Sequence, residues 1–535
     1  MQTLSSRSRK RISVGNAALL LMSTAFVAQI MGFFRTKLVN ANFNGIGVPP
    51  DQNAGIYFAA FVLPDFFFFT VAAGALGVAF MPYLSDRLHR GDRRGVWELS
   101  TSLVNFLSIF MLVVGGFMFI FADVLVRNVV AHGLTPDQQH NVATMIRILS
   151  LNPLLFTVSG VLSATQQVFG RFFFYAIAPL FYNAAIIASL YLFKDNMGII
   201  GLAIGALVGA VVQLIVIMVG TFGLGFRWSP RIKWQASDFR AMLVALPPRS
   251  LDQGIDQVQN LVETNIASSK AVGGATAIGN YNSAYVLHTA PVLLIGTAIS
   301  TAIFPKLNAR LSQGRPDLFR VDYRRVLRLI MWIALPVVVV SFFGRGYLAR
   351  FIFTQNSQEI TNIFGFLCVA ILFRTIYTII SRWFYAQKDT RTPLIVSIFV
   401  IALNIFLSYT MALKWQYGAE GLAMAQSIVA ATEVFILGII IAHRDPKLFN
   451  LEFWNGVYRI ISVTGFTLVA GFITVQFWPL MAVDQGMTLL LKFCGIAGIV
   501  LLTHITVSAI FGLDEVKPLL KWLRGLSFRS IRMEY

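Results

Sequence analysis

Long apolar stretches dominate the chain and recur from one end to the other. Examples are Ala17–Phe34, Leu103–Phe121, Ile199–Val219 and Val457–Phe477. A helix of about 20 apolar residues crosses the hydrocarbon core of a bilayer, which is roughly 30 Å thick. Strands that span a membrane would instead alternate apolar and polar residues with a period of two. The pattern therefore predicts an all-α polytopic membrane protein without a large soluble domain.

The apolar stretches predict about 14 transmembrane helices, although polar residues interrupt three of them. The predicted spans are centred near residues 24, 70, 111, 153, 183, 210, 254, 292, 338, 372, 403, 430, 467 and 500. Composition agrees with this, since only 13% of the 535 residues are charged, against about 25% in soluble domains. The first apolar stretch is interpreted as a membrane span rather than a signal peptide, because no small-residue cleavage site follows it.

The net charge of +19 is not spread evenly. Lysine and arginine concentrate in alternate predicted loops, at 7–11, 87–94, 227–240, 306–328, 388–391, 444–447 and in the tail after residue 516. The positive-inside rule places these loops, and with them both termini, in the cytoplasm, which requires an even number of spans. A membrane therefore explains the basic character better than nucleic acid does, and no nucleic-acid partner is expected.

An internal repeat divides the chain. Residues 82–91 reappear as 305–314, and residues 38–42 as 261–265, each 223 positions later. That interval holds six predicted helices, so the two copies have the same orientation in the membrane, as in transporters built from parallel repeats. We expect two six-helix bundles, at 1–236 and 237–448, followed by a terminal helix pair and a basic cytoplasmic tail at 449–535.

Ionisable residues inside predicted spans mark functional candidates, because burying them in a bilayer is costly. The span near residue 254 is the richest: Asp252, Asp256, Gln259 and Glu263 fall on one helical face. Two interpretations stay open, a water-filled cavity lining and a set of hydrogen bonds between helices.

Arg35 ends the first span, and either anchors it at the interface or contacts a phosphate, for which the planar guanidinium is well suited. Asp65 either counters an arginine or lies near the outer surface. Arg374 and Arg382 are two helical turns apart, and we expect them to project near one another. Glu433 either reaches the interface or pairs.

Motifs for catalysis are missing from the sequence. It contains no Walker motif, no HExxH and no Gly-x-Ser-x-Gly, and two cysteines cannot form a metal set. We expect no enzyme activity, no cofactor and no metal. Transport would then draw on an ion gradient, the membrane potential or consumption of the product.

Several motifs resemble those of the MurJ (MviN) lipid II flippases, within the superfamily of multidrug and oligosaccharidyl-lipid exporters. They are Met31–Arg35, Gly170-Arg-Phe with Ala178-Pro179 and Asn183, Pro248-Arg249 with Gln257, and Arg382–Pro393 followed by Asn404. Within the last of these, Arg382, Asp389, Thr390, Thr392 and Pro393 are candidates for a gating or structural role, together with Asp65 and Glu263.

The resemblance implies a flippase that moves the undecaprenyl-pyrophosphate-linked peptidoglycan precursor, lipid II, to the outer leaflet by alternating access. It further implies a multi-pass protein of the bacterial plasma (inner) membrane that serves peptidoglycan synthesis, cell wall biogenesis and cell shape. The expected partners are lipid II or a related polyprenyl-linked glycan and membrane lipids, with coupling to a monovalent ion left open. The last two helices would hold the lipid tail.

The chain departs from the family in its expected cationic cavity. Gln29, Phe68 and Val286 stand where the family usually carries arginines, and Gly55 and Ala73 where it carries acidic partners. Of the first-helix pair only Arg35 remains. The substrate-binding candidates are therefore Arg35, Gln29, Arg249, Asp252, Asp256, Gln257 and Arg374, with Arg249 and Arg374 as substitutes for the missing cations.

Two further functions compete with the flippase. An ion-coupled exporter of another lipid-linked glycan or of an amphipathic cation would use the acidic face of Asp252, Asp256 and Glu263. A non-transporting scaffold of cell-envelope assembly would use the basic loops to bind partners.

Overall fold

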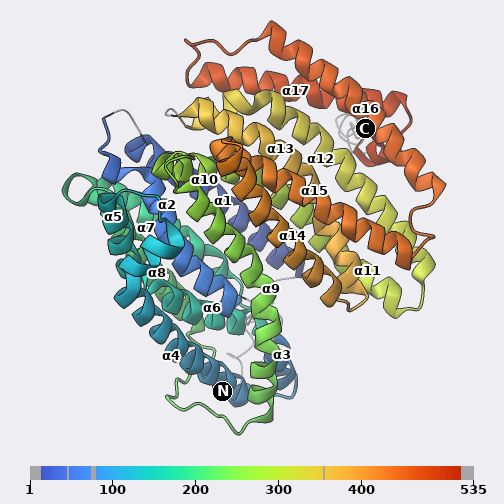
Figure 1. Ribbon diagram of the computed structural model, residues 1–535. Helices are drawn as coiled ribbons and strands as arrows, with labels where there is room; N and C mark the ends of the chain where they lie inside the picture. The colour runs from blue at the N-terminus through green and yellow to red at the C-terminus, as the bar shows by residue number, and fades with distance from the viewer. Residues whose placement is uncertain (1–13, 45–46, 74–79, 354–355, 520–535) are drawn as a thin grey trace, which may run out of the picture. The chain divides into compact units, whose positions relative to one another are not determined.

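Helices form the regular secondary structure of the protein (Figure 1). The computed structural model describes residues 14–44, 47–73, 80–353 and 356–519, and for residues 14–22, 72–73 and 245–253 it describes the backbone alone. Within these ranges there is no strand. The predicted all-α class is confirmed.

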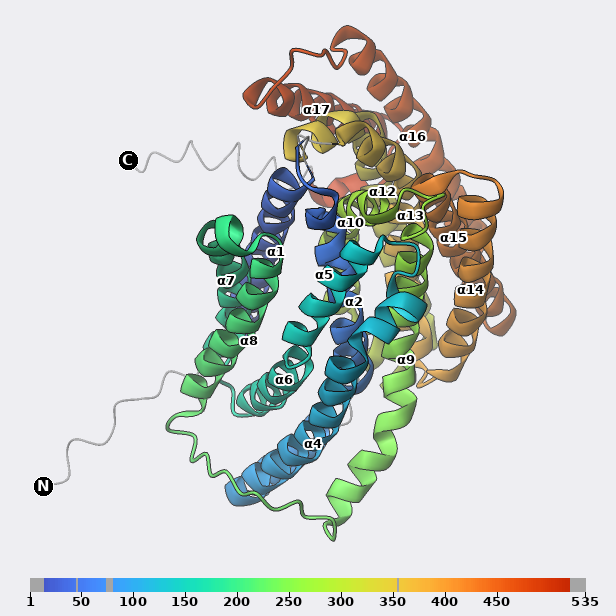
Figure 2. The same ribbon diagram turned by 60° about the vertical axis from the view of Figure 1, so that its left-hand side comes forward.

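The chain packs into two compact units, Met1–Gly279 and Asn280–Tyr535. The elements of the first unit are α1 (Val14–Phe43), η1 (Pro50–Gln52), α2 (Ala54–Phe67), η2 (Phe68–Ala73), α3 (Met81–His89), α4 (Arg93–Leu125), η4 (Val126–Val130), α5 (Pro136–Leu149), α6 (Asn152–Val168), α7 (Phe173–Met197), α8 (Ile200–Thr221) and α9 (Ser237–Ala267). Figure 2 shows α6 between α4 and α8, and it packs against both.

The second unit begins within α10. Its elements are α10 (Gly274–Pro291), η5 (Val292–Thr297), α11 (Ala298–Ser312), α12 (Pro316–Ile352), α13 (Ser357–Ala386), α14 (Arg391–Tyr409), η6 (Thr410–Lys414), α15 (Gly418–Arg444), α16 (Leu451–Phe477), α17 (Met487–Ile510) and η7 (Asp514–Val516). Here η2, η4, η5 and η6 are π-helical segments, whereas η1 and η7 are 3₁₀-helices.

In the described part of the chain, 12 helical segments are long and apolar enough to cross a membrane. Helices α1 and α9 are not among them, but with 30 and 31 residues both have the length to span. Each contains a stretch described by its backbone alone. The predicted number of about 14 spans is therefore close to what the structure shows.

The order of elements repeats between the halves of the chain. The series α2, η2, α3 and α4 is followed later by α10, η5, α11 and α12, with a π-helical segment at the same place in each. Gly91 and Gly314 follow α3 and α11 with φ angles of 76° and 68°, a left-handed conformation that glycine adopts without strain. The matching sequence motifs thus encode the same helix and the same turn.

Helix α9 packs within the first unit, although the sequence repeat makes it the first helix of the second half. It contacts α2, η2 and η4. A Cβ atom on Gly254 would come within 2.8 Å of the Thr70 methyl carbon in η2, so a larger residue here would have to displace the Thr70 side chain. The division at 236/237 stays a prediction about the repeat, while the packing boundary lies at 279/280.

The terminal pair α16 and α17 packs on α12. The indole nitrogen of Trp332 donates to the Ser508 hydroxyl at 2.9 Å. The half-buried Arg328 pairs with the buried Glu515 just after α17, at 2.6 Å. Polar contacts thus reinforce the apolar packing that holds this pair to the second unit.

Candidate functional site

Arg35 occupies a polar cluster inside the first unit. Its Nη1 donates to the Asn183 side-chain oxygen on α7 at 3.1 Å. The Asn183 amide nitrogen donates in turn to the Pro179 carbonyl at 3.3 Å, which orients the acceptor. The Nε of Arg35 is buried and has no hydrogen-bond partner among the described atoms. One guanidinium nitrogen is therefore held while another keeps its donor capacity.

Three further side chains surround this guanidinium. They are Asp65 from α2, Tyr57 from the same helix and Tyr182 from α7, and all three lie near Arg35 without a direct ion pair to it. We call Arg35, Tyr57, Asp65, Tyr182 and Asn183 the Arg35 cluster. That Asp65 counters an arginine stays a prediction, because the two side chains make no direct ion pair. A cation with a spare donor beside one carboxylate is suited to bind a phosphate oxygen.

An aromatic row lies beside the Arg35 cluster and includes Phe68, at a position for which the resemblance implies an arginine. The Phe68 ring lies 5.5 Å from the Phe156 ring, and Phe156 lies 5.1 Å from the Tyr182 ring. These distances are typical of aromatic packing. Phe68 therefore adds an apolar wall here and no charge.

Gly55 is required for close packing. A Cβ atom at this position would lie 1.8 Å from the carbonyl oxygen of Ala275 at the start of α10, which no structure tolerates. An acidic side chain cannot be accommodated without moving one of these segments. Gln29 on α1 and Val286 on α10 are both half-buried. Because both side chains are uncharged, neither supplies a cation.

The acidic face of α9 divides into residues with different surroundings. Glu263 is buried and accepts a hydrogen bond from the Gln259 side chain at 2.8 Å. Asp256 is exposed, and Gln257 is half-buried. The side chains of Arg249 and Asp252 lie outside the described residues. This bond joins two residues of α9 itself, so the choice between a cavity lining and hydrogen bonds between helices stays open for Glu263.

Arg374 and Arg382 contact different helices of the second unit. Arg374 Nη1 pairs with the buried Glu433 on α15 at 3.0 Å, and Glu433 also accepts from the Ser397 hydroxyl at 3.0 Å. Arg382 lies over the Phe304 ring of α11 at 5.0 Å and donates weakly to the Thr301 hydroxyl at 3.4 Å. The two arginines therefore have separate partners, and Glu433 pairs rather than reaching the interface.

Asp389 fastens the loop between α13 and α14. Its carboxylate accepts hydrogen bonds from the backbone nitrogen and the hydroxyl of Thr392, at 3.0 and 2.6 Å, and pairs with Arg444 at the end of α15 at 2.5 Å. Burial alone would raise the pKa of Asp389, but the bonds from Arg444 and Thr392 outweigh it and lower the pKa to about 2. Thr390 is the exposed residue before α14, and Pro393 is buried in its first turn.

The first unit closes the equivalent loop with an arginine in the loop that donates to backbone carbonyls. Gly170 and Lys388 both adopt a left-handed backbone, at φ angles of 74° and 61°, and Arg171 and Asp389 follow them. Arg171 Nη1 donates to the Phe222 carbonyl just after α8 at 2.6 Å. In both loops an arginine ties the turn to the end of the last helix of the repeat. The motif from Asp389 to Pro393 therefore has a structural role in this conformation.

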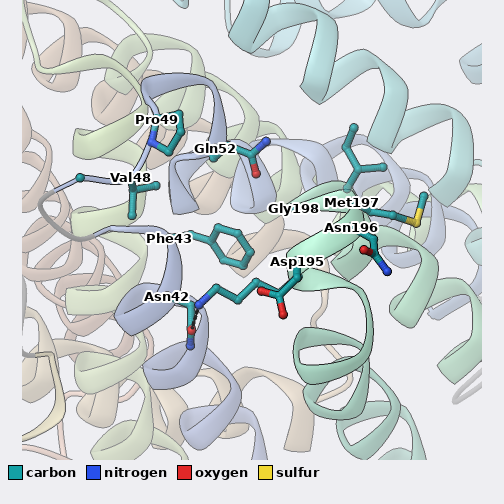
Figure 3. A pocket seen from close by; sticks show the side chains of 12 residues that line it. Asn42, Phe43, Val48, Pro49, Gln52, Asp195, Asn196, Met197 and Gly198 are labelled. Carbon is teal, nitrogen blue, oxygen red and sulfur yellow. Dashed lines mark hydrogen bonds between the residues drawn. The ribbon is translucent and has the colours of Figure 1, made fainter.

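A separate pocket of about 740 Å³ lies where α1, η1 and the end of α7 meet (Figure 3). Phe43, Val48 and Pro49 form an apolar wall, and the Lys194 side chain donates to the Asn42 side-chain oxygen at 2.8 Å. Gly198 approaches the Gln52 amide so closely that a Cβ would lie 2.0 Å from its oxygen. No residue of the Arg35 cluster lines this pocket.

Among the described residues, no group of three or more His, Cys, Asp or Glu side chains is placed to hold a metal ion.

A family model described as "Lipid II flippase MurJ" matches residues 50–493 of the chain. The chain belongs to the MurJ family of lipid II flippases. The family resemblance inferred from the sequence motifs is confirmed.

Curated relatives match most of the chain at low identity. The probable lipid II flippase of Rhizobium meliloti (strain 1021) is 24% identical over 522 residues, covering 94% of this chain and 95% of the relative. That of Borreliella burgdorferi is 23% identical over 443 residues, covering 82% and 85%. The chain therefore spans nearly the whole length of these relatives.

Solved structures of transporters share the fold. Lipid II flippase MurJ in an inward closed conformation superimposes with a TM-score of 0.77 at 21% identity, covering 93% of this chain and 100% of that one. An inward-facing multidrug-resistance transporter of the MATE family in the MOP superfamily gives a TM-score of 0.66 at 15% identity, covering 80% and 99%. The chain thus shares the multi-helix fold of these two proteins.

Proposed function

We propose that this protein translocates lipid II from the inner to the outer leaflet of a bacterial inner membrane by alternating access. The family match over residues 50–493 carries this proposal. It favours the flippase over the exporter of amphipathic cations and over the scaffold. No enzyme activity is assigned to the chain.

The basic ends of the helices face the cytoplasm in this proposal, and so do both termini. Support comes from the concentration of lysine and arginine in alternate connections between helices. Lipid II made on the cytoplasmic side would then enter from the basic end.

Arg35 contacts the pyrophosphate of lipid II in this proposal. Support comes from its buried Nε, which has no partner among the described atoms, and from its Nη1, which Asn183 holds in place. A hydrogen bond between charged groups contributes about 1.5–3 kcal/mol. Loss of one such contact would weaken binding roughly tenfold to a hundredfold.

Complementation of a bacterium depleted of its own lipid II flippase tests these roles. Wild-type protein restores growth, Arg35→Ala does not, and Arg35→Lys restores it partly because a charge without the planar fork remains. Arg127→Ala is the matched control, since Arg127 is an exposed arginine in η4 outside the Arg35 cluster. Membrane levels of each variant are measured by immunoblot. Normal growth with Arg35→Ala would refute the role of Arg35, and failure of wild-type protein would count against lipid II transport.

A further inference from the structure

A second pocket, of about 690 Å³, lies at the basic end of the first unit. It is formed by the first turns of α4 and by residues 223–233, which follow α8 and lead toward α9. The Arg35 cluster contributes nothing to it, and the flippase function assigned above does not account for it.

Cations dominate the lining of this pocket. Its five basic residues are all exposed: Arg93, Arg94, Arg227, Arg231 and Lys233. Its one carboxylate, Glu98, pairs with Arg94 at 3.1 Å and also with Lys233. Arg93, Arg227 and Arg231 have no ion pair within the described residues. The pocket therefore holds a surplus of positive charge and three guanidinium groups with free donors.

The pocket is preformed, because hydrogen bonds fasten its connecting segment to α4. The Trp97 indole donates to the Leu224 carbonyl at 3.0 Å, and the Asn105 amide donates to the Ser229 carbonyl at 2.6 Å. Trp97 also packs against the Phe226 ring at a centroid distance of 5.0 Å. Little conformational entropy would be lost when an anion binds here.

Its surroundings are those of a membrane interface. Trp228 and Trp234 are 61% and 52% exposed on the same segment, and tryptophan is enriched where hydrocarbon meets water. Directly beside the pocket, Met218 and Val219 at the end of α8 are exposed, as is Phe222 just after it, at 70%. An apolar strip thus leads away from the cations along a helix that crosses the membrane.

We infer that this pocket binds the phosphate head group of an anionic phospholipid of the cytoplasmic leaflet. Arg227 and Arg231 donate to the phosphodiester oxygens through their planar forks. The acyl chains lie along the exposed apolar side of α8. This inference rests on the membrane orientation proposed above but does not require lipid II transport, so the two fail separately.

Quenching of tryptophan fluorescence by brominated lipid measures this binding. Full-length protein is placed in phosphatidylcholine nanodiscs, and the mole fraction of brominated phosphatidylglycerol is raised stepwise. Wild-type protein shows a saturable quenching component that Trp228→Phe reduces. Because a hydrogen bond between charged groups contributes about 1.5–3 kcal/mol, Arg227→Gln and Arg231→Gln each raise the half-saturating mole fraction at least about tenfold, more than loss of diffuse attraction alone would.

Arg90→Gln is the control, since Arg90 lies three residues before α4 but outside the pocket, with its side chain 78% exposed. An equal shift of the half-saturating mole fraction in this variant would show diffuse attraction to the membrane and would refute a specific binding site. Equal quenching by brominated phosphatidylcholine would overturn the preference for an anionic lipid. Displacement of the lipid by the same concentration of inorganic phosphate would assign the pocket to free phosphate instead.

Discussion

Disrupting the ion pair between Arg374 and Glu433 tests whether this arginine binds the substrate or stabilises the helix bundle. At the observed N–O distance of 3.0 Å, attraction between the charges amounts to about 5 kcal/mol at an effective dielectric constant of about 20. Desolvation offsets part of this, and removal of one partner from a buried pair costs about 3–5 kcal/mol. Glu433→Gln keeps a hydrogen-bond acceptor, so we expect a loss near 3 kcal/mol.

The double variant Arg374→Met with Glu433→Met leaves no unpaired charge. Replacing a buried pair by apolar residues is often neutral or stabilising, so this variant should recover most of the stability that Glu433→Gln loses. The exposed pair of Asp514 and Lys517 supplies a control, because breaking it by Asp514→Asn should cost less than about 1 kcal/mol.

Thermal unfolding in detergent, followed by tryptophan fluorescence, ranks the stability of these variants, and a lipid II translocation assay measures their function. We expect the double variant to translocate lipid II within about threefold of wild type. A double variant that melts like wild type but does not translocate would refute the structural role and return Arg374 to the substrate site. An unchanged melting temperature in Glu433→Gln would show that the pair contributes little to stability.

Two more substitutions test the packing and the loop anchor. Gly55→Ala places a methyl group 1.8 Å from the Ala275 carbonyl oxygen and should lower the melting temperature sharply, whereas Gly116→Ala, with open space around it, should be neutral or slightly stabilising; equal melting of the two variants would contradict the close contact. Because the folded pKa of Asp389 lies near 2, below its unfolded value near 4, its contribution to stability is present above pH 4 and is lost as pH falls toward 2. The melting-temperature difference between wild type and Asp389→Asn should thus be constant from pH 8 to about 4 and shrink below it, and a difference that instead changes between pH 6 and 8 would point to another group.

The sequence predicts the helical class, the spans and the repeat well, because apolar run length and turn glycines are local signals. The same is true of the Asp389 loop, since an aspartate that accepts a hydrogen bond from the backbone two residues on forms an Asx turn. Such a turn could have been assigned from the residues alone. The tie from Arg444, 55 positions away, could not.

Contacts between distant helices account for what the sequence did not predict. Glu433 is 59 positions from Arg374, so the pair that neutralises this arginine has no local signature. Gly55 was interpreted as the loss of an acidic partner, whereas its lack of a side chain is what allows the Ala275 backbone to approach. The basic pocket joins α4 to residues more than 120 positions away. Its arginines were therefore interpreted only as markers of orientation.

Translocation of lipid II by purified protein in proteoliposomes tests the central claim most directly. Fluorescent lipid II is placed in both leaflets. A membrane-impermeant reagent then measures how much of the lipid II in the inner leaflet becomes accessible from outside over time. We predict that wild-type protein speeds this exchange above protein-free vesicles and that Arg35→Ala, at the same density, does not. Exchange at the protein-free rate with folded wild-type protein would contradict lipid II transport by this chain.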